Sequence, residues 1–436
     1  MAATVDSSET PTKAPADAGP AAGAPTRGSR QGVATDEVRR HNLGAVLERL
    51  HLSGPLSRSD LTRFTGLNRS TIADLLGELT GLGLVAERPG ATGAGPGRPS
   101  PVVHLRPERA TVLAIELAVD SVAVATVGLG AHVYNQVRVA RPRGRFSPEE
   151  TVHDVAKLAG PQIDSLPGEH VLVGVGVAVA GITRRSDGFV HLAPNLGWHD
   201  VPIAEMLAAE LDLGAPVAAA NEADLGALAE HRRGVHAGTS NLVYVSGEVG
   251  IGAGVIVDGK PLLGSAGYAG EAGHTLVDPD GRPCGCGAIG CWETEAGEAA
   301  LLRRAGVGEG TARLDEVVER AAAGDATTLR AIEEVGRWLG LGIGNLINLF
   351  NPDLVVLGGL YQRLFTLLEP SVLEGARMRA LEAPAAMASI ARSGLGSDAP
   401  LIGAAELVMS RVIADPARVD GRRVKGRVGT VGGRRR

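Results

Sequence analysis

All three cysteines of this chain of 436 residues fall within eight consecutive positions, as Cys284, Cys286 and Cys291. His274 precedes the first of them by ten residues, and glycines separate the thiols. Three thiolates and one imidazole complete the tetrahedral shell of a structural Zn²⁺ site, and glycine lets the backbone fold closely around an ion. The alternative is three reduced thiols in a glycine-rich loop. Because the cysteines cluster so exclusively, we predict a structural zinc rather than a catalytic one.

Composition and charge narrow the class of protein. No apolar run reaches the ~18 residues of a membrane span, and the polar, proline-containing start lacks the pattern of a secretory signal. We therefore expect a cytoplasmic protein with reduced thiols and no membrane contact. The net charge is −6, yet residues 417–436 carry eight Lys and Arg against one Asp. We interpret this end as a basic disordered tail, with phosphate attraction as the alternative.

Residues 1–35 show no periodicity and predict a disordered arm. A domain of three short helices then follows over residues 36–106. Its first helix carries apolar residues at helical spacing, namely Leu43, Val46, Leu47 and Leu50. Ser57 and Asp60 have the spacing of a capping box for the second helix. We expect Leu61, Phe64 and Leu67 to form the buried side of that helix, and Asn68 to cap the third.

Two short helices joined by a turn at Gly66 are typical of a helix-turn-helix. At the start of the third helix, Arg69, Ser70 and Thr71 face outward, and these side chains suit contacts with base edges and phosphates in a major groove. A strand, a loop rich in Gly and Pro, and a second strand predict a wing, from which Arg98 would enter a minor groove. The alternative is a plain three-helix bundle. We predict a winged helix-turn-helix that binds DNA.

From about residue 110 to residue 416 the pattern changes to α/β. Runs rich in β-branched residues alternate with helical stretches at 201–212, 222–233 and 326–350. This alternation predicts a body of two lobes, each centred on a sheet.

The segment "GYAGEAGH" followed by "CGCGAIGCWE" resembles the ROK family, which groups repressors with sugar kinases. "LAPNLGWHDVP", "NEADLGALAE", "GIGAGVIVDGKPLLG" and "NPDLVVLGGL" also occur in the family's order, and the resemblance runs from the helix-turn-helix to about Pro416. It implies a winged helix fused to a two-lobed, actin-like (ribonuclease-H-like) sugar-kinase body.

The resemblance also implies a sugar site. His274 would contact the sugar as well as the zinc, and hydroxyl contacts would come from Asn195, Asn221, Glu271 and Glu293. Amides and carboxylates suit this role because each can pair with vicinal hydroxyls. We include the neighbouring Glu222 among the expected ligand-binding residues, although it departs from the family's pattern.

The phosphate machinery of the kinase members is altered here. Their first turn resembles Asp-x-Gly-Gly-Thr-Lys, whereas this chain reads Glu116-Leu-Ala118-Val119-Asp120-Ser. Side chains thus replace the glycines whose amides would approach phosphate, and Asp120 adds a negative charge. In the second phosphate loop, Glu248 and Val249 replace Gly and Thr.

The position of the catalytic Asp carries Glu222, whose longer arm would misplace the base. We therefore predict that the chain is not an enzyme.

Together these features predict a sugar-responsive repressor of carbohydrate-utilisation genes that binds operator DNA as a homodimer and is released by a sugar. One alternative is an ATP-dependent sugar kinase with a fused DNA-binding domain. The other is an activator or constitutive DNA binder with a vestigial pocket.

Overall fold

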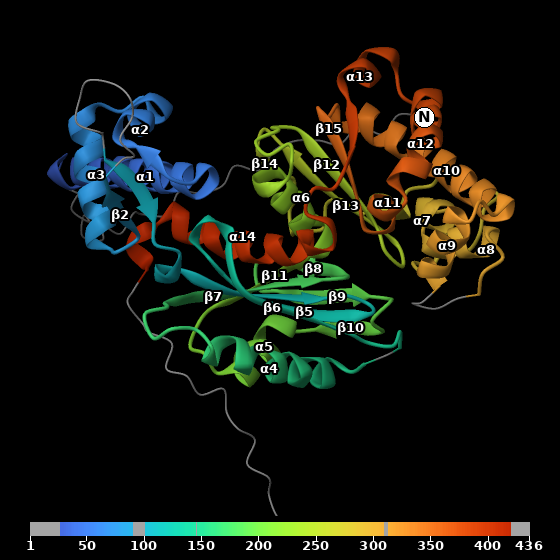
Figure 1. Cartoon of the computed structure of the whole chain (residues 1–436), viewed down its shortest axis with the longest axis horizontal. Helices are drawn as coiled ribbons and strands as arrows, with labels where there is room; N and C mark the ends of the chain where they lie inside the picture. The colour runs from blue at the N-terminus through green and yellow to red at the C-terminus, as the bar shows by residue number, and fades with distance from the viewer. Residues whose placement is uncertain (1–26, 90–100, 145, 309–312, 420–436) are drawn as a thin grey trace, which may run out of the picture.

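A computed structural model describes residues 27–89, 101–144, 146–308 and 313–419. It arranges them as an N-terminal helical part and a body of two lobes (Figure 1). Each lobe contains a five-stranded sheet, so the predicted α/β body with two sheet-centred lobes is confirmed. No helix within these ranges is long and apolar enough to cross a membrane.

The helical part has three helices and a small antiparallel sheet of order β1-β3-β2. Its elements are α1 (Arg27–Ser53), β1 (Leu56–Ser57), α2 (Arg58–Thr65), α3 (Arg69–Gly81), β2 (Val85–Arg88) and β3 (Val102–Leu105). Helix α1 begins at Arg27, inside the segment for which an arm is predicted. The loop between β2 and β3 includes residues 90–100, which lie outside the described ranges.

The predicted helix boundaries in this part follow from local chemistry. Ser57 caps α2, and Asp60 completes the capping box, while Gly66 ends the helix at a φ of 70°. The side chain of Asn68 accepts from the amide of Thr71 and caps α3. One expectation is wrong: Phe64 is 46% exposed rather than buried. The guanidinium of Arg49 lies 3.8 Å from the centre of its ring, so the ring stacks on a cation instead of entering the core.

The N-terminal lobe is a sheet of order β11-β7-β4-β5-β6. Its strands are β4 (Thr111–Leu117), β5 (Ser121–Gly128), β6 (His132–Ala140), β7 (Leu172–Val179) and β11 (Val217–Asn221). Helices α4 (Pro148–Asp164) and α5 (Ile203–Leu211) cover one face, and α14 (Ala399–Ala414) covers the other (Figure 1). Because side chains alternate along a strand, Leu113 and Ile115 pack under α4 while Val112 and Ala114 pack under α14.

A small antiparallel sheet of β8 (Ile182–Arg184), β9 (Phe189–Ala193) and β10 (Trp198–Val201) extends this lobe beyond the end of β7. The turn between β9 and β10 carries Asn195. Thus a predicted sugar contact is placed by a hairpin at the edge of the lobe.

The C-terminal lobe is a sheet of order β14-β13-β12-β15-β16. Its strands are β12 (Leu242–Gly247), β13 (Ile251–Val257), β14 (Lys260–Pro261), β15 (Leu354–Gly358) and β16 (Ser389–Arg392). One face packs on α6 (Glu222–Arg233) and the other on a layer of helices. That layer comprises α7 (Trp292–Ala296), α8 (Glu298–Arg304), α9 (Arg313–Ala322), α10 (Ala326–Phe350), α11 (Gly359–Arg363), α12 (Phe365–Arg379) and α13 (Glu382–Met387).

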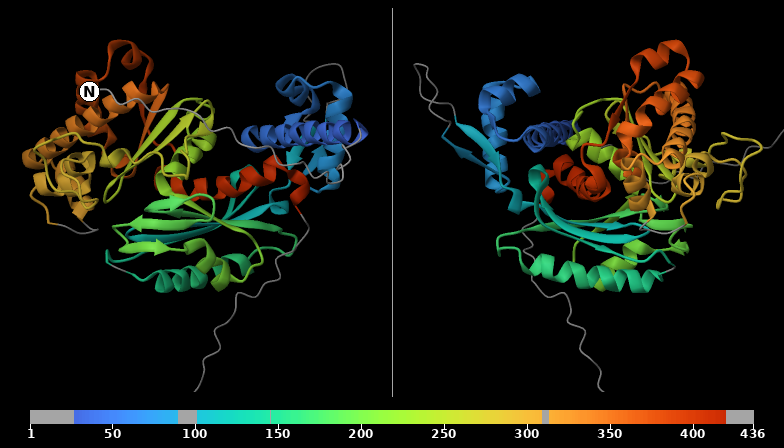
Figure 2. Two further views of the ribbon diagram at one scale, coloured as in Figure 1. Left: turned by 180° about the vertical axis from the view of Figure 1, so that it is seen from behind. Right: turned by 45° about the vertical axis from the view of Figure 1, so that its right-hand side comes forward.

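The helical part is anchored to the body. Helix α1 lies against the end of α14 (Figure 2), where a Cβ at Gly44 would lie 2.6 Å from the carbonyl oxygen of Ile413. Leu47 and Leu50 of α1 belong to the same apolar cluster as Val408 and Val412 of α14. A continuous core therefore joins the two parts, and they cannot turn independently without exposing apolar surface.

Candidate functional site

A cavity of about 280 Å³ lies between the two lobes. Its wall contains all six residues expected to bind a sugar, which come from separate segments of the chain. They are Asn195, Asn221, Glu222, Glu271, His274 and Glu293. The structure therefore places amides, carboxylates and an imidazole around one cavity, and this chemistry suits a ligand with several hydroxyl groups.

Asn221 and Glu222 reach the cavity because β11 ends there and α6 begins. The Asn221 side chain caps the helix: its Oδ1 accepts from the amide of Ala223 at 2.7 Å, and its Nδ2 donates to the carbonyl of Gly181 at 3.0 Å. This side chain therefore has backbone partners at both ends of its amide. A hydroxyl bound at Asn221 has to share these hydrogen bonds. Because its side chain caps the helix, Asn221 positions the start of α6 as well as lining the cavity.

The four predicted metal ligands form a cluster at the edge of the cavity. One ligand atom from each of His274, Cys284, Cys286 and Cys291 lies within 4.8 Å of the others. The loop is tightly folded here, since a Cβ at Gly290 would lie 1.6 Å from the carbonyl oxygen of Asp278. Three sulfur atoms and one imidazole nitrogen at this spacing match the donor set of a structural zinc site.

The cluster is joined to the cavity through Glu293. Its Oε1 lies 2.8 Å from the sulfur of Cys284 and 3.6 Å from Nδ1 of His274. Since Glu293 and His274 both line the cavity, the loop that carries this cluster fixes the position of part of the cavity wall.

A second cavity, of about 680 Å³, adjoins the first, and Glu222 and Glu248 line both. Its wall includes Glu116, Ala118 and Asp120, three of the positions that differ from the kinase pattern. Burial and the nearby Glu248 raise the pKa of Glu222 well above its usual value. Loss of water in the cleft and the charges of Asp120 and Glu116 raise the pKa of Glu248 to about 8. The raised pKa values show that this part of the cavity disfavours additional negative charge.

Sequence reasoning missed the arginines that line this cavity. Arg138 donates to Glu116 at 2.8 Å, and Arg143 lies 3.2 Å from Asp120. Each arginine is therefore paired with a carboxylate in the wall of this cavity. Both lie in the basic stretch at the end of β6, but nothing in that stretch indicates their partners.

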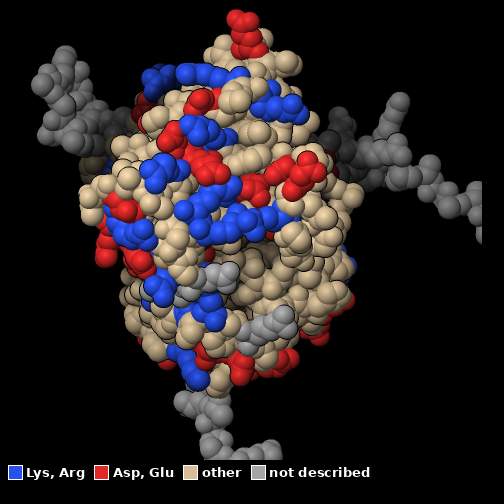
Figure 3. All heavy atoms as spheres, turned by 90° about the vertical axis from the view of Figure 1, so that its right-hand side faces the viewer, with Lys and Arg blue, Asp and Glu red and all other residues tan. Residues whose placement is uncertain are grey.

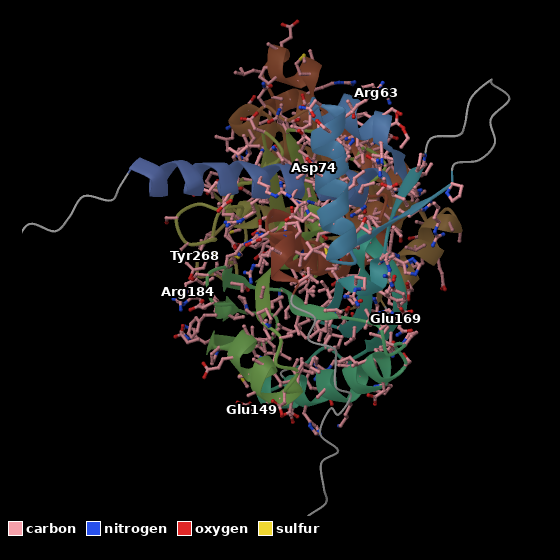
Figure 4. All side chains as sticks on the ribbon, turned by 90° about the vertical axis from the view of Figure 1, so that its left-hand side faces the viewer. Arg63, Asp74, Glu149, Glu169, Arg184 and Tyr268 are labelled. Atoms are coloured by element: carbon pink, nitrogen blue, oxygen red, sulfur yellow. The ribbon has the colours of Figure 1, made fainter. Side chains whose placement is uncertain are left out.

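The predicted DNA-contacting residues form the start of α3 in the helical part. This part faces the viewer in Figure 4, where Arg63 marks α2 and Asp74 marks α3. Arg69 and Ser70 are exposed and Thr71 is partly exposed, all in the first turn of α3. Ser70 donates to Asn68 at 2.7 Å. Arg98 lies outside the described residues. At the opposite end of the molecule, basic and acidic side chains are interspersed (Figure 3).

The model of the ROK family matches residues 112–411, which span both lobes. The chain belongs to the ROK family. Among its relatives, the xylose repressor of Caldicellulosiruptor bescii is 30% identical over 379 residues, covering 83% of this chain and 93% of the repressor.

Two solved structures of ROK family proteins share the fold of this chain. A ROK family transcriptional regulator, a homologue of the Escherichia coli Mlc protein, has a TM-score of 0.72 at 24% identity and covers 87% of this chain and 98% of its own. A ROK glucokinase from Streptomyces griseus, solved with glucose and AMPPNP, has a TM-score of 0.60 at 26% identity and covers 68% of this chain and 98% of its own. The likeness to the regulator thus includes more of this chain than the likeness to the kinase.

Proposed function

We propose that this ROK protein is a transcriptional repressor that binds operator DNA through α2 and α3 and is released by a sugar bound between its lobes. The observation that carries the proposal is the continuous core that joins the helix-turn-helix to a body whose cavity is lined by amides, carboxylates and an imidazole. A ligand that binds one arrangement of the lobes better than another can then bias the orientation of the DNA-binding helices.

The DNA contacts would come from Arg69, Ser70 and Thr71 in the first turn of α3, with Arg98 as a contact from the wing. A homodimer would present two such helices to a pseudo-palindromic operator whose half-sites are separated by whole helical turns. Arginine supplies bidentate contacts to guanine, and the hydroxyls supply adaptable contacts to bases or phosphates.

The ligand would be a sugar or sugar derivative held by Asn195, Asn221, Glu222, Glu271, His274 and Glu293. Zinc bound by the His274 cluster would hold the loop that carries His274 and adjoins Glu293. The similarity to xylose repressors makes D-xylose the first ligand to test, and D-glucose follows from the glucokinase relatives.

A sugar kinase is the second candidate function, because the body resembles glucokinases and its cavity suits a sugar. The altered phosphate turns argue against it. Asp120 and Glu248 put carboxylates near the position of a nucleotide's phosphates, and Glu222 replaces the expected base with a longer side chain. ATP turnover on a panel of sugars tests this candidate directly.

The deciding experiment is fluorescence anisotropy of labelled DNA from upstream of the protein's own gene, titrated with and without sugars. We expect tight, salt-dependent binding that one sugar weakens. Binding that no sugar alters would refute the sugar-responsive repressor and leave a constitutive DNA binder. Absence of binding together with ATP turnover would establish the kinase instead.

A further inference from the structure

Three helices meet at a buried polar cluster where the helical part joins the body. His51, near the end of α1, is 1% exposed, and its Nε2 lies 3.0 Å from Oε2 of Glu406 in α14. Arg233, at the end of α6, donates to Oε1 of Glu406 at 2.7 Å and to the carbonyl oxygen of His51 at 2.7 Å. Arg232 also donates to Glu406, at 3.0 Å, and lies 3.8 Å from Glu48 of α1. These four residues, His51, Glu406, Arg232 and Arg233, form the junction cluster.

The hydrogen bonds of the junction cluster determine which ring nitrogen of His51 carries the proton. The amide of Gly130, in the turn after β5, donates to Nδ1 of His51 at 2.9 Å. Nδ1 therefore accepts, and the ring proton lies on Nε2, which donates to Glu406. Every polar group of the ring has a partner, so α1 is held in one orientation relative to α14 and α6.

Helix α6 connects this cluster to the cavity between the lobes. It begins at Glu222, in the cavity wall, and ends at Arg233, in the junction cluster. Its twelve residues span roughly 18 Å at the rise of an α-helix. A single rigid element thus has one end at the proposed sugar site and the other on the DNA-binding part.

Helices α14 and α6 are each packed closely against the sheet of a different lobe. Helix α14 is held on the N-terminal lobe, where a Cβ at Gly176 of β7 would lie 1.9 Å from the carbonyl oxygen of Ala404. Helix α6 is held on the C-terminal lobe, where a Cβ at Gly254 of β13 would lie 2.4 Å from the carbonyl oxygen of Ala223. A change in the angle between the lobes therefore turns one helix against the other.

The backbones of the two helices approach each other closely at Gly403. A Cβ at Gly403 of α14 would lie 2.0 Å from the carbonyl oxygen of Leu225. Leu225 is about 5 Å along α6 from Glu222 and about 12 Å from Arg233 at the helical rise. Rotation about this contact moves the arginine end more than twice as far as the cavity end.

We propose that α6 is a lever that pivots at Gly403 and carries the state of the inter-lobe cavity to the DNA-binding helices through Arg232 and Arg233. This proposal rests on the proposed function, because it requires that a sugar alters DNA binding. Arg233 is the main contact between the helices, because it donates both to Glu406 of α14 and to the backbone carbonyl of His51 in α1.

The test compares Arg233→Gln with Arg304→Gln in the full-length protein. Arg304 is a matched control because its side chain is 14% exposed, close to the 12% of Arg233. It also pairs with carboxylates, Glu295 and Glu334, but these lie inside the C-terminal lobe. Sugar affinity is measured by calorimetry with D-xylose and D-glucose, and operator affinity by anisotropy with and without each sugar.

We expect Arg233→Gln to bind the sugar as the unsubstituted protein does, while the sugar's effect on operator affinity falls by about fivefold or more. Arg304→Gln should retain the full effect. Arg233→Gln with an undiminished effect, or an equal loss in Arg304→Gln, overturns the lever. If no sugar alters operator affinity in the unsubstituted protein, the proposed function fails, and the lever fails with it.

Hydrogen exchange in the unsubstituted protein keeps the proposal testable if Arg233→Gln does not fold. Saturating sugar should change amide protection at residues 221–224 and also at residues 48–53 and 230–234. Protection that changes at the cavity end alone would contradict the lever.

Discussion

Arg143 of the N-terminal lobe pairs with Glu298 of the C-terminal lobe across the larger cavity. A second bond joins Nη2 of Arg143 to Oε1 of Glu298 at 3.1 Å, and the same nitrogen lies 3.2 Å from Oδ2 of Asp120. Glu298 is only 4% exposed. The two lobes are thus linked by a charged bidentate contact beside the turn that carries Asp120.

Replacing Glu298 by Gln removes one charge of this link and leaves Arg143 with Asp120. We expect the free energy of unfolding to fall by about 1–3 kcal/mol, because the guanidinium loses its more buried partner. Urea unfolding followed by circular dichroism measures the change. Glu149→Gln, at an exposed position in α4, is the control and should alter stability little. Equal free energies of unfolding for the two variants would show that the Arg143–Glu298 pair does not stabilise the fold.

Acid should weaken the junction cluster through His51. Burial, only partly opposed by Glu406, lowers the pKa of His51 below 6.5. The folded state therefore binds fewer protons than the unfolded state, so stability is complete above pH 6.5 and falls as the pH drops below it. The slope from one such group cannot exceed about 1.4 kcal/mol per pH unit.

The measurement is the unfolding free energy between pH 7.5 and 5.5 for the unsubstituted protein and for His51→Gln. Glu406, Arg232 and Arg233 are the charged groups that act on His51. Burial tends to raise the pKa of Glu406, but its contacts with His51 and the two arginines lower it below its usual value. His170 is also buried with a lowered pKa, and it titrates in both proteins. An identical pH dependence in the two proteins would exclude His51 as the source.

Metal removal should loosen the wall of the smaller cavity. We expect a single zinc ion per chain by elemental analysis, and Cys286→Ser should lose it and unfold at a lower temperature. Cys286 is exposed, so its replacement leaves the surrounding packing intact and reports on the metal. Prolonged chelation of the unsubstituted protein should reproduce the effect, and full stability without metal would show that the loop holds itself.

Arg69→Ala should weaken operator binding by about 1–3 kcal/mol if the side chain reads a base, and it should relax specificity at that base pair. If Arg69 instead contacts phosphate, binding should weaken on all sequences and the dependence on salt should decrease. Arg377→Ala is the control, since Arg377 is exposed on α12 of the C-terminal lobe. An unchanged affinity for Arg69→Ala would remove the first turn of α3 from the proposed interface.

The elements of the helical part could be predicted because their signals are local. Ser57 with Asp60, and Asn68 with Thr71, act within three residues of each other, so sequence spacing alone sets their geometry. Phe64 shows the limit of this reasoning. Its helical spacing favours burial, yet the ring stacks under Arg49 of a different helix, and no local pattern indicates that contact.

The difference between local signals and contacts made by distant residues also applies to the His274 cluster and the rest of the site. Four ligands within 18 residues of sequence, from His274 to Cys291, limit the geometries open to them, so the sequence by itself determined the donor set. The family resemblance implied five of the six expected sugar contacts, with Glu222 added as their neighbour, and the fold places all six in one cavity wall. The pairings of Arg143 with Glu298 and of His51 with Glu406 join residues 155 and 355 positions apart. Only the tertiary structure decided these pairs, because the distance between such residues depends on how both lobes and α1 pack around α6 and α14.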